Sequence, residues 1–397
     1  MSNDMIIDVD CHHSWPFDRD LIQYMPRAWR EYFTAAAGPG LADSVQDVGY
    51  GSSGGYSPFL PPWVHYPFSG GGGTRLECMP KEGGAAGSSR QVLIDEHLNP
   101  HGIARAVLTF GYGTQQGILN APASVALCRA ANDYTIDKWL DGREDRLYGV
   151  LLVPVSAPEE AAKEIYRLAD HPRIVGALVM TNPFLKPLGH PVYDPILRAA
   201  DETGLVIFTH AAADFTSKGA WYAGGLPTSM TEIYLGLEQV GMHHFTSVIC
   251  SGVFEKFPHL RILFNEYGFT WMPWMLAELD SRYAALKIEN PLIKRLPSEY
   301  FAEHVWASTQ PFAMVAEASK VERLLETCPS IADHLCYSSD YPHWDAEDPG
   351  SVRVRLPQEW RSKVMGKNAA RLFGWDDLVG GAVGTGRRTE VRLSAGS

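Results

Sequence analysis

The stretch LYGVLLVPVSAPEEAAKEIYRLADHPRIVGALVM, residues 147–180, contains the unit that decides the fold. Two short apolar runs, 147–154 and 175–180, enclose a longer helical pattern at 157–170. Continuous runs of Val, Leu and Ile without strict alternation are typical of strands that are buried on both faces of a parallel sheet. The stretch therefore predicts a strand, a helix and a second strand parallel to the first.

The same unit recurs along the chain in both directions. Eight apolar runs are candidate strands: 6–10, 104–110, 147–154, 175–180, 205–210, 261–266, 304–308 and 334–340. Helical patterns separate most of them, at 121–141, 157–170, 194–203, 229–240 continuing towards 257, 312–327 and 357–373. Eight strands that alternate with helices predict an α/β protein with a TIM-like (β/α)8 barrel, which accommodates this length in one domain.

Two segments depart from the regular alternation. Residues 13–98, between the first two runs, are rich in Gly, Ser, Pro and aromatic residues. Long insertions after a barrel strand are where lids and specificity loops occur, so we expect an insert that partly covers the pocket. Residues 376–397 lose apolar periodicity and predict a flexible tail or a subunit contact. The expected organisation is one barrel over 1–375, with that insert and that tail.

The charge of the chain excludes two classes of partner. Lys and Arg number 34 against 46 Asp and Glu, which gives a formal net charge of −12. An acidic surface repels nucleic-acid phosphates and anionic lipids, so we expect neither nucleic acid nor a membrane as a partner. Hydrophobic residues make up 45% of the chain and charged residues 20%, which is the composition of a folded protein.

The cysteines and the first residues indicate the compartment. The six cysteines show no CxxC spacing, so we expect reduced thiols rather than disulfides or a thiolate zinc site. The beginning, MSNDMIIDVD, lacks the basic and apolar regions of a signal peptide. No run approaches the roughly 18 apolar residues of a membrane helix. These features predict a cytoplasmic protein.

Polar residues stand where several of the predicted strands end. They are Asp10 and His12 on the first strand, His210 on the fifth, Glu266 on the sixth and Asp340 on the eighth. In a barrel these carboxyl ends meet on one face, and residues two apart on a strand share a side, so Asp10 and His12 point together. Carboxylates with imidazoles are ligands that suit Zn²⁺, Mn²⁺ or Fe²⁺.

Each of these residues also has a purely structural interpretation. A single histidine at a strand end is more often a packed, hydrogen-bonded side chain than a metal ligand. Asp10 could cap the following turn, and Asp340 could begin a β-turn in SSDYPH. Four such residues at the same end of independent strands favour the metal site.

Several motifs resemble one known family. The strings IIDVDCHH, IFTHAA, FPHLRILFNEYG, SEYFAEHVWASTQPF and CYSSDYPHWD are similar to those of the amidohydrolase-related family, in the branch of aminocarboxymuconate-semialdehyde decarboxylase and the resorcylate-type decarboxylases. The similarity runs from residue 5 to about 375 and leaves out the Gly-rich insert. The resemblance implies one divalent ion bound by Asp10, His12, His210 and Asp340, with Zn²⁺ favoured over Mn²⁺ or Fe²⁺, no organic cofactor, and a homodimer.

Two departures from the family pattern bear on the reaction. The first strand has Asp-x-His, which resembles the acidic-x-His form of decarboxylases rather than the His-x-His of hydrolases. Glu266 stands where the family has a histidine near the substrate, so Glu266 is open as a ligand, an acid/base group or a salt-bridge partner. We therefore favour a non-oxidative decarboxylase of a small carboxylated aromatic or unsaturated acid, with Asp340 or Glu266 as the proton donor and His210 among the catalytic residues.

Two other functions compete with decarboxylation. A metal-activated water could instead hydrolyse an amide, a lactone or a C–C bond, with Asp340 taking the proton. A barrel without catalysis could serve in binding. Aromatic and polar residues near the strand ends are candidates for a pocket that holds a flat substrate ring: Trp15, Phe110, Tyr112, Asn182, Trp271, Gln310, His343 and Trp344.

Overall fold

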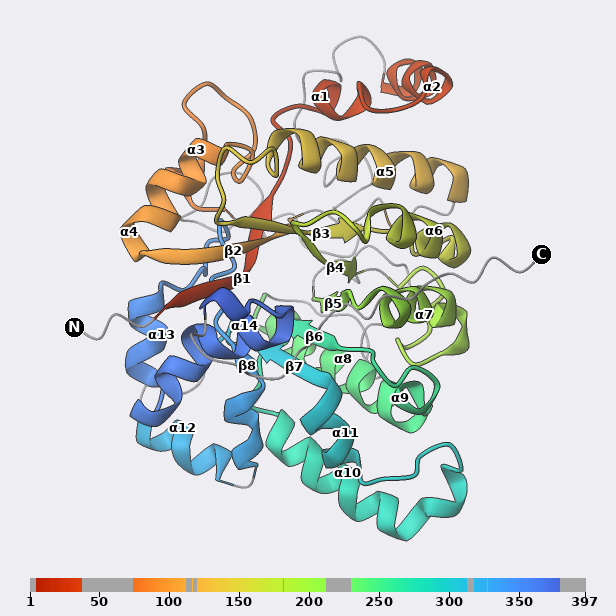
Figure 1. Ribbon diagram of the computed structural model, residues 1–397, viewed down its shortest axis with the longest axis vertical. Helices are drawn as coiled ribbons and strands as arrows, with labels where there is room; N and C mark the ends of the chain where they lie inside the picture. The colour runs from red at the N-terminus through yellow and green to blue at the C-terminus, as the bar shows by residue number, and fades with distance from the viewer. Residues whose placement is uncertain are drawn as a thin grey trace.

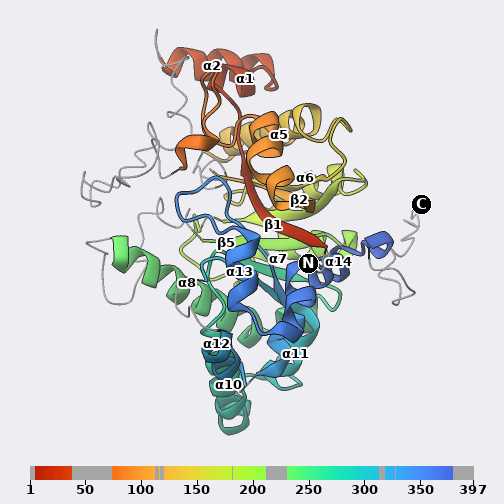
Figure 2. The ribbon, with the colours of Figure 1, turned by 90° about the vertical axis from the view of Figure 1, so that its left-hand side faces the viewer.

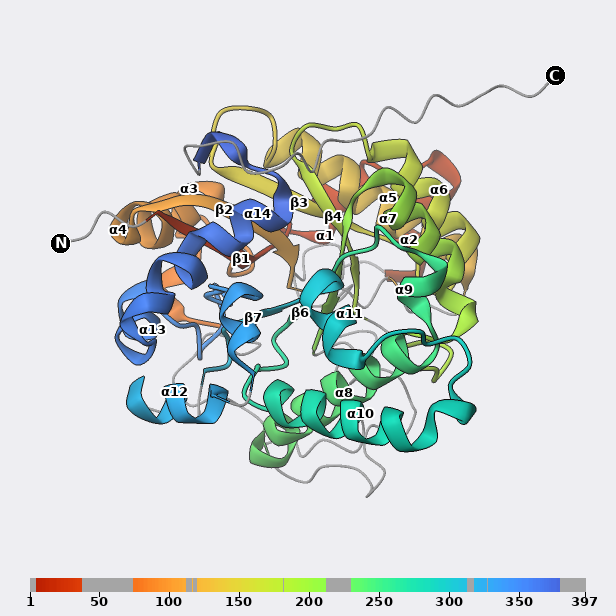
Figure 3. The same cartoon turned by 60° about the horizontal axis from the view of Figure 1, so that its bottom comes forward.

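The computed structural model describes residues 5–37, 74–111, 116, 120–180, 182–211, 230–312, 318–326 and 328–378. Eight parallel strands form one sheet in the order in which they occur in the chain, and helices surround it (Figures 1 and 3). The strands are β1 (Ile6–His13), β2 (Ile103–Phe110), β3 (Leu147–Leu152), β4 (Ile174–Val179), β5 (Val206–His210), β6 (Ile262–Asn265), β7 (Val305–Ser308) and β8 (Leu335–Cys336). The prediction of a (β/α)8 barrel is confirmed.

The barrel closes between its first and last strands. The Val9 N–H donates to the Tyr337 carbonyl at 3.1 Å, and Cys11 pairs with Tyr341 in a parallel bridge. The strands read as apolar runs because both of their faces are buried: Ile7, Leu108 and Leu151 have no exposed surface.

The helices occupy the positions between the strands. They are α1 (Asp18–Ile22), α2 (Arg27–Ala37), α3 (Arg90–Leu93), α4 (Asn99–His101), α5 (Ala121–Lys138), α6 (Pro158–Leu168), α7 (Asp194–Thr203), α8 (Met230–Cys250), α9 (Val253–Lys256), α10 (Met272–Leu286), α11 (Pro297–His304), α12 (Ala318–Leu325), α13 (Pro349–Arg355) and α14 (Asn368–Phe373). Short 3-10 or π turns are η3 (Leu76–Cys78), η4 (Ile94–Leu98), η6 (Pro191–Tyr193), η8 (Lys287–Glu289), η9 (Pro329–Asp333), η10 (Gln358–Trp360), η11 (Lys363–Lys367) and η12 (Asp376–Leu378).

Two helix predictions need correction, and some helices have no counterpart in the prediction. The pattern at 229–257 is two helices, α8 and α9, because Gly252 between them has a left-handed backbone with φ of +64°. The pattern at 357–373 is not one helix but η10, η11 and α14. The helices α10 and α11, which lie between β6 and β7, were not predicted at all.

The described ends of the insert pack against the strands that carry the candidate site. Thr74 forms an antiparallel bridge with His343, and the Arg75 N–H donates to the Pro342 carbonyl at 2.9 Å. The first part of the insert folds into α1 and α2, which lie beside α5 (Figures 1 and 2). Residues 38–73 lie outside the described residues, so the cover over the pocket stays a prediction.

The beginning of the predicted tail is folded. Asp376–Leu378 forms η12, and Asp377 forms an ion pair with Arg105 of β2. Residues 379–397 lie outside the described residues. All six cysteines lie in the described part and are free thiols, as predicted. Among the described residues, no helix has both the length and the apolar character that crossing a membrane requires.

Candidate metal centre

Four predicted ligands come together at the carboxyl end of the barrel. The potential donor atoms of Asp10, His12, His210 and Asp340 all lie within 4.8 Å of one another. Each of the four side chains is buried, with at most 2% of its surface exposed. They come from β1, from β5 and from the loop after β8, so the closed barrel, and not proximity in sequence, assembles the cluster.

A β-bulge sets the direction of the side chains on β1. Asp8 pairs with Ala106 of β2, but Cys11 pairs with Leu108, so the step of three residues on β1 faces a step of two on β2. Asp10 and His12 therefore face the interior together, as their spacing predicts. Asp8, which strict alternation would place beside them, turns instead towards Cys11, whose thiol donates to it at 3.1 Å.

Thr109 of β2 orients both interior side chains of β1. Its hydroxyl donates to Asp10 Oδ1 at 2.5 Å and lies 2.9 Å from His12 Nδ1. The single hydroxyl proton serves Asp10, so the His12 contact requires a proton on Nδ1. His12 Nε2 then faces Asp340 Oδ1 at 2.8 Å.

The protonation of His12 is a test of whether this set fits a cation. Burial lowers the pKa of His12, which favours the neutral ring with one N–H. A neutral ring cannot donate to Thr109 and to Asp340 at once, so one nitrogen faces an oxygen lone pair without a proton. A divalent cation between His12 Nε2 and the carboxylates removes that conflict, and the residues therefore fit a metal ion.

His210 is anchored in the same way. Its Nδ1 lies 2.6 Å from the Ala211 carbonyl, which fixes the ring, and its Nε2 lies 3.2 Å from Asp10 Oδ2. Burial alone would lower the pKa of His210, but the Asp10 carboxylate and its hydrogen bond raise it to about 10 in the metal-free centre. A ligating histidine whose other nitrogen binds a carbonyl is the usual arrangement of metal sites.

Asp340 is the most heavily hydrogen-bonded residue of the centre. Its Oδ1 lies 2.8 Å from His12 Nε2 and 2.8 Å from His343 Nδ1, and its Oδ2 accepts from Gln310 Nε2 at 3.0 Å. Burial alone would raise the pKa of Asp340, but His343 and His12 hold it well below the usual range. Its backbone is left-handed, with φ of +63°, an unusual conformation for a residue other than glycine.

Glu266 lies beside these four residues and belongs to a second group of potential donors, with His12, Asp340 and His343. Its backbone is also left-handed, with φ of +59°, and its Oε2 lies 3.3 Å from His210 Nδ1. That oxygen has no hydrogen-bond partner among the described residues, although the side chain is buried. Burial, and then the nearby Asp340 carboxylate, raise the pKa of Glu266 to about 8.

Two predicted pocket residues are part of the centre. Gln310 and His343 both hydrogen-bond Asp340, and Gln310 Oε1 has no partner among the described residues. Burial alone would lower the pKa of His343, but Asp340 raises it to about 9. His343 also approaches Glu266, since the potential donor atoms of His12, Glu266, Asp340 and His343 lie within 4.8 Å of one another.

The other predicted pocket residues have the contacts of core or loop residues. Trp15 donates to Asp18 and packs edge-on to Tyr134; Phe110 packs on His13; Asn182 accepts from the Lys186 N–H and the Tyr193 hydroxyl; Trp271 donates to the Tyr267 carbonyl. Trp344 is 40% exposed and follows His343. Tyr112 lies outside the described residues. A pocket role for these residues stays a prediction.

Sequence reasoning missed Thr109 and Asn265. Thr109 is the polar residue next to the end of the second predicted strand, and this position was a signal that could have identified it. Asn265 pairs with His210 in the sheet, so the two side chains share the interior face. Both polar atoms of its buried amide lack a partner among the described residues.

The family of the chain follows from a match over most of its length. A family model described as amidohydrolase matches residues 92–375. The chain therefore belongs to the amidohydrolase family, and the resemblance drawn from its motifs is confirmed.

Individual proteins resemble the chain at low sequence identity. A gamma-resorcylate decarboxylase of Rhizobium sp. (strain MTP-10005) is 24% identical over 290 residues, which cover 70% of this chain and 85% of the relative. The structure of an amidohydrolase from Mycobacterium avium subsp. paratuberculosis superposes with a TM-score of 0.66 and 19% identity, covering 94% of this chain and 100% of that chain.

A further structure combines the fold with a bound metal. A 5-carboxyvanillate decarboxylase from Novosphingobium aromaticivorans, solved with manganese and 4-hydroxy-3-methoxy-5-nitrobenzoic acid, has a TM-score of 0.64 and 19% identity. The match covers 94% of this chain and 96% of that chain. These structural similarities establish the shared fold.

Proposed function

We propose that this protein is a divalent-metal-dependent decarboxylase that removes CO₂ from a small carboxylated aromatic or unsaturated acid without oxidation. The observation that carries the proposal is the buried cluster of Asp10, His12, His210 and Asp340, whose first member makes the β1 motif acidic-x-His. The relative named gamma-resorcylate decarboxylase and the similar structure of a 5-carboxyvanillate decarboxylase support the reaction class.

The four clustered residues would hold one divalent ion. When bound there, such an ion would supply Lewis acidity towards a substrate carboxylate and a neighbouring oxygen. The chain's own residues fix the geometry: Thr109 and the Ala211 carbonyl hold the two imidazoles, and Gln310 and His343 hold Asp340. The ion would also offset the negative charges of Asp10 and Asp340, which would otherwise repel an anionic substrate.

Of the two candidate proton donors, Glu266 has the better geometry. Both oxygens of Asp340 are occupied by hydrogen-bonded side chains, whereas Glu266 Oε2 is buried and, although it lies 3.3 Å from His210 Nδ1, has no hydrogen-bond partner among the described residues. We infer that protonated Glu266 delivers its proton to the ring carbon that bears the carboxylate. A π electron pair of the ring forms the new C–H bond, which leaves Glu266 as a carboxylate. The electron pair of the breaking C–C bond then returns to the ring as the carboxylate group leaves as CO₂.

The identity of the metal is part of the proposal. Two carboxylates with two imidazoles suit Zn²⁺, Mn²⁺ and Fe²⁺ alike. Sequence reasoning favoured Zn²⁺, and the similar decarboxylase structure carries manganese. We propose Mn²⁺ as the activating ion, with Zn²⁺ as the competing assignment. Stripped protein reloaded with each metal in turn decides between them: higher turnover with Mn²⁺ is expected, and higher turnover with Zn²⁺ would contradict the choice.

The experiment that separates decarboxylation from hydrolysis uses labelled water. The metal-loaded protein is incubated with hydroxybenzoic acids in H₂¹⁸O, and both CO₂ and the ring product are analysed. We expect CO₂ release and a ring product without ¹⁸O. A product that contains ¹⁸O would indicate hydrolysis by metal-bound water. Less than about a tenth of an equivalent of metal, with no gain on adding Mn²⁺ or Zn²⁺, would favour a catalytically inactive binding protein.

The assembly, the compartment and the domain limits also stay proposals. A homodimer follows from the family resemblance and is tested by sedimentation, where the mass of a single chain would contradict it. A cytoplasmic location agrees with the six free thiols, which suit a reducing compartment. Limited proteolysis tests the proposed single barrel over 1–375: we expect early cleavage within 13–98 and 376–397.

A further inference from the structure

Asp8 is a buried carboxylate that touches none of the four clustered side chains. It has no exposed surface, and its side chain contacts Cys11 and His97 beside the bulge in β1. A buried charge of this kind is costly unless it is fully paired, so its contacts indicate its role.

One oxygen of Asp8 joins the two chain segments that carry ligands. Asp8 Oδ1 accepts the backbone N–H of Asp10 at 3.1 Å and that of Ser339 at 2.9 Å. Ser339 is the neighbour of Asp340, whose own N–H donates to the Asp10 carbonyl at 3.1 Å. Segments 8–10 and 339–340 lie near opposite ends of the chain, with Asp10 and Asp340 330 residues apart in the sequence. Asp8 Oδ1 holds the two segments at a fixed distance.

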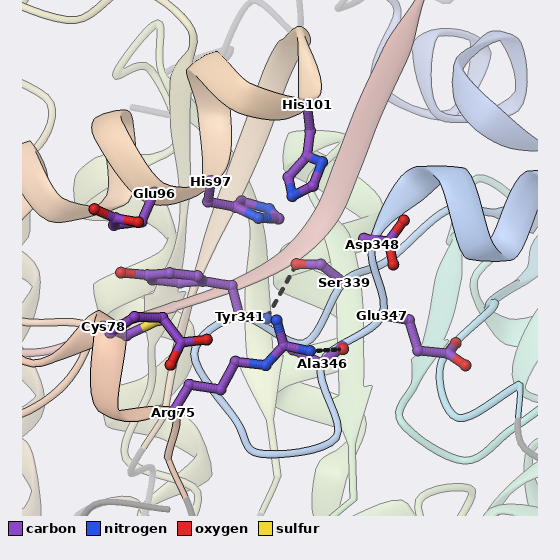
Figure 4. A pocket seen from close by; sticks show the side chains of 11 residues that line it. Arg75, Cys78, Glu96, His97, His101, Ser339, Tyr341, Ala346, Glu347 and Asp348 are labelled. Atoms are coloured by element: carbon purple, nitrogen blue, oxygen red, sulfur yellow. Dashed lines mark hydrogen bonds between the residues drawn. The ribbon is translucent and has the colours of Figure 1, made fainter.

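His97 of η4 holds the other oxygen. His97 Nε2 lies 2.7 Å from Asp8 Oδ2, and the same oxygen accepts from the Cys11 thiol. The His97 ring stacks on Tyr341, with centroids 5.1 Å apart, and the Tyr341 N–H donates to Ser339 Oγ at 3.0 Å. Figure 4 shows His97 above Tyr341 and Ser339 beside a small pocket. The imidazole therefore contacts both sides of the seam, by which we mean the junction of segments 8–10 and 339–341.

We propose that Asp8, held by His97, is a positioning residue that sets the separation of the metal ligands Asp10 and Asp340. The inference rests on the proposed function, because it takes these two residues as ligands. Asp8 acts through backbone hydrogen bonds and touches neither metal nor substrate. Outer residues that orient ligands commonly change metal affinity by 10-fold to 100-fold when they are replaced.

The same residues admit a second interpretation, as a separate metal site. Potential donor atoms of Asp8, Cys11 and His97 lie within 4.8 Å of one another. We favour positioning because each Asp8 oxygen already accepts two hydrogen bonds, which leaves no oxygen waiting for a ligand. Metal stoichiometry distinguishes the two.

The test is a titration of the full-length, metal-free protein with Mn²⁺, in which electron paramagnetic resonance measures the free ion. Asp8→Ala removes the shared acceptor, so we expect at least about tenfold weaker Mn²⁺ binding. Asp8→Asn keeps one carbonyl oxygen and should stay within about threefold of wild type. Asn132→Ala is the control, because Asn132 is a buried residue that bridges α5 to Leu152 of β3 and to Glu164, away from the seam.

If Asp8→Ala does not fold, His97→Leu and His97→Gln replace it. Weaker binding in the leucine variant with recovery in the glutamine variant supports the proposal. Wild-type affinity in Asp8→Ala or in His97→Leu overturns it, and so does an equal loss in Asn132→Ala. Two bound ions in wild type, one of them lost in Asp8→Ala, would establish the second metal site instead. A wild type that binds no Mn²⁺ contradicts the proposed function itself.

Discussion

Two acidic residues of the centre have an unusual backbone. Glu266 and Asp340 are left-handed, with φ of +59° and +63°. Such conformations cost about 1–3 kcal/mol each in a residue other than glycine and persist only where surrounding structure enforces them. The Glu266 N–H is held by the Ser308 hydroxyl at 3.1 Å, and the Asp340 N–H by the Asp10 carbonyl at 3.1 Å. The surrounding barrel, and not the intrinsic backbone preference of the two residues, therefore sets the direction of the two carboxyl groups.

The proposed role of Glu266 as a proton donor predicts a loss of turnover without a loss of metal binding. Glu266→Gln keeps the size of the side chain but removes its acidic proton, so we expect kcat to fall by about 100-fold or more while bound metal stays at the wild-type level. Glu164→Gln is a control for replacing a buried acid, since Glu164 pairs with Arg167 on α6. Wild-type kcat in Glu266→Gln would remove the assigned role.

The buried side chain of His334 makes the free energy of unfolding depend on pH. Burial, and then the Arg371 guanidinium, lower the pKa of His334 to about 4. The unfolded chain, with its ordinary pKa near 6.5, binds the proton more readily, so this stability is present above about pH 6.5 and is lost as the pH falls towards 4. Between pH 7 and pH 5, His334 contributes about 2 kcal/mol to the change in the free energy of unfolding.

His334→Asn isolates this contribution. The asparagine amide can still donate to the Val305 carbonyl, which His334 Nδ1 approaches at 2.9 Å. We expect the variant to be less stable at pH 7, because the ring contacts with Phe301 and Trp306 are lost. Urea unfolding at both pH values should show a pH-dependent loss smaller by about 2 kcal/mol than in wild type. The same pH dependence in both proteins would show that His334 does not titrate on unfolding.

At the scale of elements, sequence patterns predicted the strands better than the helices. Each strand is a buried apolar run, so composition alone marks it, and all eight were found. The helix α10 was missed because its sequence, MPWMLAELDSRYAAL, carries apolar residues on several sides. The single helix expected at 357–373 is broken at η11, where a Cβ on Gly366 would lie 2.5 Å from the Met5 carbonyl oxygen.

Some features of the candidate site could also be predicted from the sequence, and others could not. Asp10, His12, His210 and Asp340 were predictable because each stands at or near the end of an apolar run that predicts a strand. The β1 bulge and the position of Asp8 were not, because a bulge depends on how β1 pairs with β2, about a hundred residues away in sequence. Thr109 was missed because a threonine in an apolar run fits an ordinary strand.

The packing of the insert against β1 makes Gly87 sensitive to substitution. A Cβ on Gly87 would lie 2.8 Å from the backbone oxygen of His12, and φ is +76°. Gly102 has a similar φ of +63°, but its Cβ would meet nothing within 4 Å. Gly102→Ala should therefore cost about 1 kcal/mol of stability, and Gly87→Ala about 1–3 kcal/mol more. Urea denaturation measures the free energy of unfolding of both variants. Equal decreases would show that the insert moves away from the new methyl group without loss of stability.

At the scale of the whole molecule, barrel closure creates the site. The proposed ligands come from β1, β5 and the loop after β8, which meet only because the sheet runs in chain order from β1 to β8 and then joins its own first strand. A parallel barrel buries its strands and presents their carboxyl ends on one face, so binding residues can vary there with little effect on the core. The same fold therefore accommodates both hydrolysis and decarboxylation, and the residues at this face decide between them.

The most direct measurement is release of ¹³CO₂ from carboxyl-labelled hydroxybenzoic acids by Mn²⁺-loaded protein, compared with Asp340→Asn. We expect wild type to release CO₂ in proportion to bound metal, and the folded variant to release less than about a hundredth as much. The reason is that Asp340 is a proposed ligand and also contacts His12, Gln310 and His343. Release by Asp340→Asn at the wild-type rate, or equal release by metal-free protein, would contradict a metal-dependent decarboxylase centred on these four residues.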